Sequence, residues 1–230
     1  MMYKKYHIFI ILIFLISLTE GCTRDKNIIA MVNGIPVTRS EMSYWMLLEK
    51  ADVYRYFYQK YEVKDSENFW YTSCEGEIPI EKLKTKAFNN AKRCKVEQQL
   101  SLSKGIDTET NFDSIVSRMS VVNKERSEKI KKGIVIYGPK KFTIRTYFLY
   151  LHDKMVYDLK EELRKKELKS TREKLELLNP NDSSSVDKNH MFYEMQYVDK
   201  NYDSFIDSLT QKAVVKINIS NWKSIYQTKE

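Results

Sequence analysis

The sequence is poor in the two residues that most often interrupt regular structure. It contains 6 Gly and 4 Pro among 230 residues, whereas average usage would supply about 28 of the two together. Sandwiches, propellers and α/β barrels need many turns, so this scarcity argues against them and predicts long helices. Three Cys and three His, with no cluster of either, do not suggest a disulfide scaffold or a metal site. No cofactor is expected.

The first residues have the pattern of an export signal. Lys4 and Lys5 precede an apolar run over 8–18, which is too short to span a bilayer comfortably. Residues 1–21 are therefore predicted to be a signal peptide.

A cysteine follows this segment directly. Gly21-Cys22 resembles the cleavage site of bacterial lipoproteins, in which the Cys becomes the new N-terminus and carries the lipid. We therefore expect lipidation at Cys22 and a polar tether over 22–27. An uncleaved signal anchor is the main alternative, and a buried N-terminal helix is a third. Either of the first two interpretations places the rest of the chain outside the cytoplasm, on the bacterial cell membrane or secreted.

The chain is basic, with a formal net charge of +8. Outside the cytoplasm, nucleic acid is not an expected partner. A positive surface there fits anionic lipid headgroups or acidic wall polymers. A basic surface without a specific partner is the simpler interpretation.

A β-hairpin is predicted near the start of the exported part. Asn33-Gly34 lies between two β-prone runs, 28–32 and 35–37, and both central positions of a type I′ turn require a positive φ. Pro36 confines the second run to a sheet edge. A third strand is expected at 215–219, where apolar and polar residues alternate.

Helical spacing and capping signals predict four long helices. They run from 39 to 61, from 79 to a cap at Gly105, from 111 to 131, and from about 143 onward. A second capping box at 170–173 predicts a separate short helix. A linker is expected over 179–194, with an extended segment at 191–198.

The first of these helices carries more aromatic residues than a single apolar stripe can hold. The surplus indicates either a helix buried on two sides, which we favour, or an exposed groove for a ligand. Together with two aromatic residues that follow the helix, the candidates for a peptide-binding lining are Tyr44, Trp45, Leu48, Tyr56, Trp70 and Tyr71.

The order of several segments resembles the exported foldases of the SurA and PrsA kind. Residues 31–41 read MVNGIPVTRSE, similar to the opening VNG-x-P-[IV]-[ST]-x-x-[EQ] of that family. Phe69-Trp70, the helix end at Gly105, the run 136–139 and the run 213–218 follow in the family's order.

The resemblance implies a mainly α fold. Residues 28–178 and 195–230 would form one helical chaperone domain, with a small antiparallel sheet made by the N-terminal hairpin and the C-terminal strand. In that family a parvulin prolyl isomerase module is commonly inserted, and 179–194 leaves no room for one. The paired His of such a module are also missing, because His152 is expected alone on a helix surface and His190 in a loop. No catalytic residue is predicted.

The implied function is a non-catalytic chaperone that binds unfolded exported polypeptides, anchored to the membrane through the N-terminal lipid or the signal. Two alternatives stay open. One is an enzyme related to the prolyl isomerases, and the other is a lipoprotein adaptor for one envelope partner.

Overall fold

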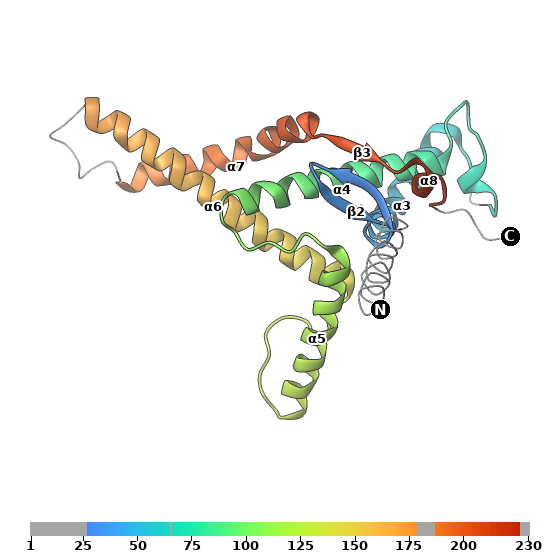
Figure 1. The fold of residues 1–230 in the computed structure, drawn as a ribbon, viewed down its shortest axis with the longest axis horizontal. Helices are drawn as coiled ribbons and strands as arrows, with labels where there is room; N and C mark the ends of the chain where they lie inside the picture. Colours follow the sequence, from blue (N-terminus) through green and yellow to red (C-terminus); the bar gives the residue numbers. More distant parts are fainter. Residues whose placement is uncertain (1–26, 65, 179–186, 226–230) are drawn as a thin grey trace, which may run out of the picture. The chain divides into compact units, whose positions relative to one another are not determined.

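The computed structural model describes residues 27–64, 66–178 and 187–225. The predicted signal over 1–21 and the predicted lipidation site Cys22 lie outside the described residues. The fold is mainly helical with a small three-stranded antiparallel sheet (Figure 1), which confirms the expected fold class. None of the described helices is long and apolar enough to cross a membrane.

The described chain forms ten elements. In order they are β1 (Ile28–Val32), β2 (Ile35–Thr38), α3 (Arg39–Tyr61), the 3-10 turn η1 (Phe69–Tyr71), α4 (Pro79–Ser103), α5 (Phe112–Lys131), α6 (Ile144–Leu178), α7 (Asp187–Lys212), β3 (Val215–Ile217) and α8 (Ile219–Lys223).

These elements belong to two compact units. Among the described residues, the first unit comprises those within 27–91 and 214–225, and the second comprises those within 92–213. The boundary therefore falls inside α4, which contributes its first half to one unit and its second half to the other. The grouping by compactness thus differs from the sequence-based grouping of 28–178 with 195–230.

The sheet of the first unit has the strand order β2-β1-β3, with both pairs antiparallel. Asn33 and Gly34 have φ values of 49° and 85°, as the type I′ turn requires. Pro36 lies on the edge strand β2, where its missing N–H costs no ladder hydrogen bond. β3 pairs with β1 through Ala30↔Ile217 and Val32↔Val215. The predicted pairing of the C-terminal strand with the hairpin is thus confirmed.

The helices of the first unit begin at the predicted signals. The Thr38 hydroxyl oxygen accepts a hydrogen bond from the backbone N–H of Glu41 at 3.3 Å, and this caps α3. α4 begins at Pro79, a position that needs no intrahelical N–H. The apolar residues at helical spacing in this part of α4 are buried: Ile80, Leu83, Ala87 and Ala91.

In the second unit, α4 ends in a Schellman cap. Gly105 takes a φ of 76°, and the N–H of Ile106 donates to the carbonyl of Ser101 at 3.0 Å. The side chain of Ile106 then packs against a core formed by Leu159, Tyr202 and Ile206. The left-handed Gly105 and the hydrogen bond from Ile106 confirm the predicted helix end.

Two local predictions in this unit are wrong. α6 continues without a break to Leu178, so 170–173 do not begin a new helix. No Gly or Pro occurs over 144–178 to stop it, and adding a residue to an existing helix costs far less than starting one.

The expected extended segment at 191–198 lies in α7, as does the 187–194 part of the expected linker. The same helix holds the backbone of His190, which is therefore not in a loop. The helical apolar spacing that begins at Tyr202 extends back along the chain and overrides the β propensity of 191–198. The 179–186 part of the expected linker lies outside the described residues.

Candidate functional site

The six aromatic and apolar side chains predicted as a peptide-binding lining all belong to the first unit. Tyr44 is buried, with 5% of its surface exposed, and contacts Trp45 edge-to-face at 5.3 Å between ring centroids. Trp70 contacts Phe69 in the same way at 5.0 Å. Leu48, Tyr56 and Trp70 are half-buried, and Tyr71 is exposed. Tyr56 and Trp70 belong to one aromatic cluster, because each contacts one ring of the Phe57–Phe69 pair.

Tyr56 belongs to a polar cluster around one carboxylate. The hydroxyls of Tyr56 and Tyr61 donate to Glu77 Oε2 at 2.7 and 2.9 Å. The ammonium groups of Lys60 and Lys82 lie 3.3 and 3.2 Å from the same carboxylate. These hydrogen bonds, the two from the tyrosines first, lower the pKa of Glu77 to about 2. The cluster ties the end of α3 to the start of α4, which is a structural role.

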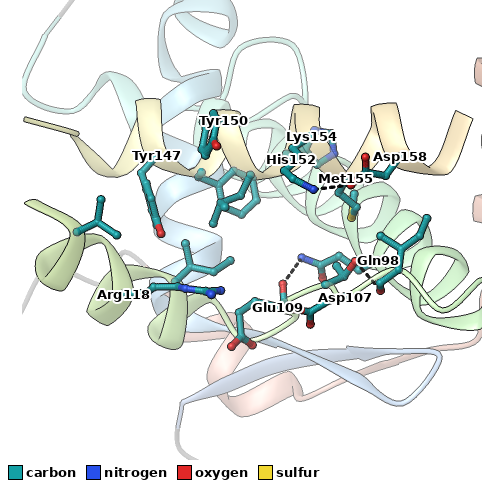
Figure 2. A pocket seen from close by; sticks show the side chains of 16 residues that line it. Gln98, Asp107, Glu109, Arg118, Tyr147, Tyr150, His152, Lys154, Met155 and Asp158 are labelled. Carbon is teal, nitrogen blue, oxygen red and sulfur yellow. Dashed lines mark hydrogen bonds and ion pairs between the residues drawn. The ribbon is translucent and has the colours of Figure 1, made fainter. Parts of the chain in front are cut away.

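A pocket of about 580 Å³ lies in the second unit. Figure 2 shows α6 on one side, with Tyr147 and His152, and Arg118 of α5 and the connecting segment 106–111 on the other. Apolar and aromatic side chains form much of the walls: Ile115, Val122, Tyr147, Phe148, Leu151 and Met155. Charged side chains of both signs add to the lining: Asp107, Glu109, Arg118, Lys154 and Asp158.

Two side chains of α4 hold the connecting segment 106–111 in place. The buried ammonium of Lys95 donates to the carbonyl of Thr110 at 2.7 Å. The side-chain amide of Gln98 donates to the carbonyl of Glu109 at 3.3 Å. Gln98 lines the pocket and is 4% exposed. Within the described part of the chain, its Oε1 is buried and has no hydrogen-bond partner.

His152 lines the same pocket and differs from its prediction. It is not on the open face of α6. Its side chain is 23% exposed, its Nε2 lies 2.8 Å from Glu97 Oε2, and its ring stacks on that of Phe148. Glu97 is buried on α4 and also accepts from the hydroxyl of Tyr202 on α7 at 3.3 Å. One carboxylate thus joins three helices behind the pocket.

The volume of the pocket suits the binding of a ligand. A volume of this size matches pockets that take ligands of a few hundred daltons or several side chains. Among residues 27–64, 66–178 and 187–225, no group of three His, Cys, Asp or Glu side chains is placed to hold a metal ion.

Sequence reasoning missed this pocket. The recurrence of Tyr147, Leu151 and Met155 at every fourth position is typical of a core-facing stripe, and Tyr147 and Met155 are buried. The signal available was the short charged segment after the Gly105 cap, where Asp107 and Glu109 stand. Its distance from α6 in the sequence hid the relationship.

The chain is similar to one characterised protein. It is 30% identical over 95 residues to a protein of Bifidobacterium longum subsp. longum named "Chaperone for lacto-N-biosidase". The shared stretch covers 41% of this chain and 34% of the relative, so about a third of that protein's length is matched. No family model matches the chain, and no solved structure matches it.

Proposed function

We propose that this chain is a non-catalytic chaperone that binds a client polypeptide in the pocket of the second unit. The observation that carries the proposal is the lining of that 580 Å³ pocket. Its apolar walls suit the side chains that an unfolded chain exposes. Charged side chains of both signs suit the polar groups of a peptide backbone.

The similarity to a named chaperone supports the same proposal. That relative's name specifies one enzyme as its client. This favours, as a second candidate, a protein dedicated to one exported partner over a general binder of unfolded chains. A pull-down from membranes distinguishes them, because a dedicated protein retains one stoichiometric partner and a general chaperone retains many in small amounts.

The proposal includes an exported, lipid-anchored location. It rests on the apolar run over 8–18 and on Cys22 directly after the predicted signal. Mass spectrometry of the N-terminus of the protein from its native membrane tests it, since a lipid-modified Cys22 at the first position is the expected result. An intact Met1 would contradict cleavage and favour a signal anchor.

Kinship with the SurA and PrsA foldases remains a prediction. Under the proposed function, the protein has no prolyl isomerase activity. A protease-coupled prolyl peptide assay tests the enzymatic alternative. A rate above the uncatalysed isomerisation, which takes tens of seconds or longer, would support that alternative instead.

Client binding is tested by suppression of aggregation of a reduced, unfolding model protein. Leu151 lines the pocket, whereas Leu149 on the same helix is exposed and outside the lining. We expect Leu151→Asp to weaken suppression several-fold and Leu149→Asp to leave it unchanged. Equal effects, with both variants folded by circular dichroism, would contradict the pocket as the binding site.

A further inference from the structure

We propose that the tip between α5 and α6, defined as residues 129–141, docks on the surface of an anionic lipid bilayer. This inference goes beyond client binding and does not depend on it. The tip comprises the last residues of α5 and the loop that leads to α6 (Figure 1).

Apolar side chains at the tip face water. Ile134, Val135 and Tyr137 are 50%, 78% and 90% exposed. Large apolar side chains that are exposed together, within four consecutive residues, usually mark an interaction surface.

The residues of the helix cap at the tip explain why the side chain of Ile134 is exposed to solvent. α5 ends in a Schellman cap, in which the N–H of Ile134 donates to the carbonyl of Lys129 at 3.0 Å and Gly133 takes a φ of 69°. The residue in the position of Ile134 frequently packs against a side chain one turn back on its own helix. At the end of α4 the equivalent Ile106 is covered instead by the core of Leu159, Tyr202 and Ile206. At the tip the positions one turn back hold Glu128 and Lys129, so the isoleucine remains at the surface.

The loop is held in this conformation by α5. The guanidinium of Arg126 donates to the carbonyls of Tyr137 and Pro139 at 2.6 and 2.9 Å. The side chain of Asn123 makes two hydrogen bonds to the backbone of Phe142, at 2.9 and 2.7 Å. The apolar side chains are therefore presented on an ordered loop, which lowers the entropy lost when the tip docks.

The positive charge of the tip indicates which kind of surface it binds. Residues 129–141 contain five lysines and no acidic residue, and all five are exposed: Lys129, Lys131, Lys132, Lys140 and Lys141. Phosphate-bearing headgroups complement such a group of lysines, and the exposed apolar side chains between them in the sequence can enter the boundary between headgroups and acyl chains. Tyr is a favoured residue at that boundary. An unfolded client has no fixed negative charge to match the lysines, whereas an anionic bilayer presents negative charge over its whole surface.

The test uses the full chain in vesicles made of equal parts phosphatidylglycerol and phosphatidylcholine. A photoreactive benzophenone amino acid replaces Tyr137 in one sample and Tyr157 in the control. Tyr157 is an exposed tyrosine of α6 outside the tip. Both variants carry the same N-terminal segment, so membrane binding through that segment affects the two samples equally.

We expect lipid adducts at position 137 to exceed those at position 157 several-fold. Charge reversal in the double variant Lys140→Glu with Lys141→Glu should lower the adduct yield at 137 by roughly tenfold, since each lysine near an anionic surface contributes measurably to binding. Equal adducts at both positions, or an equal yield in pure phosphatidylcholine, would overturn the proposal. So would adducts to an added client in place of lipid, which would make the tip a client site while leaving the pocket test above unaffected.

Discussion

Asn33 and Val214 hold each other by two hydrogen bonds across 181 residues of sequence. The backbone N–H of Asn33 donates to the carbonyl of Val214 at 2.8 Å, and the N–H of Val214 donates to the side-chain Oδ1 of Asn33 at 2.7 Å. The residue that makes the hairpin turn therefore also fixes where the C-terminal segment joins the sheet.

Replacing Asn33 should weaken the first unit in two separable ways. Asn33→Gly keeps the positive φ and loses the Oδ1 acceptor, which should cost about 1 kcal/mol. Asn33→Ala also strains the left-handed backbone and should cost about 1–2 kcal/mol more. Urea unfolding measures both changes. A loss for Asn33→Ala no larger than that for Asn33→Gly would contradict a role for the backbone conformation.

The Glu77 cluster should make stability depend on acid pH. Its folded pKa of about 2 lies below the ordinary value of 4.5, so its contribution is present above pH 4.5 and is lost as the pH falls toward 2. Glu77→Gln should flatten the dependence of melting temperature on pH in that window. Glu75→Gln, in the same turn, is the control and should follow the original protein.

Tyr202 should make stability depend on alkaline pH. Burial raises the pKa of Tyr202, and the nearby Glu97 carboxylate raises it further. An unfolded tyrosine ionises near pH 10, so the contribution of Tyr202 is present below pH 10 and declines above it.

The variant Tyr202→Phe should lose about 1 kcal/mol at neutral pH with its hydrogen bond to Glu97. Its stability should then fall less steeply above pH 10 than that of the original protein. Tyr157→Phe, at an exposed position of α6, serves as the control in the same urea titrations. Parallel alkaline curves for the original protein and Tyr202→Phe would contradict the assignment.

A substitution at Gln98 should affect client binding more than it affects the stability of the fold. The variant Gln98→Leu loses a long 3.3 Å hydrogen bond and removes the buried acceptor that has no partner within the described residues. We therefore expect a change in stability of less than about 1 kcal/mol in either direction. Client affinity, measured by titration calorimetry, should fall several-fold, because the substitution removes a polar side chain from the pocket lining. Gln99→Leu, at an exposed neighbouring position, should leave affinity unchanged, and a strongly destabilised Gln98→Leu would show that the residue is structural.

Local chemistry explains what could be predicted from the sequence. The turn at Asn33-Gly34, the cap at Thr38 and the helix end at Gly105 each depend on residues within a few positions of one another. The pairing of β3 with β1 is a long-range contact, and it was accessible because the alternation at 215–219 identified a strand that needed a partner.

The relationships that escaped prediction join distant residues or depend on helix continuation. His152 has the appearance of a surface residue until Glu97, 55 positions earlier, is placed beside it. The capping pattern at 170–173 has the right residue types, but nothing before it ends α6. The pocket arises from α5, α6 and the segment 106–111 together, and single-element patterns carry no information about such an assembly.

The sheet order has a consequence for biosynthesis. The inner strand β1 emerges early, yet its second neighbour β3 is made after the whole of the second unit. At about 5–20 residues per second, the 181 positions from Asn33 to Val214 correspond to a delay of about 10–40 s. During that interval one side of β1 is an open edge that can pair with another nascent chain. The sheet of the first unit can therefore be completed only after the whole of the second unit has been synthesised.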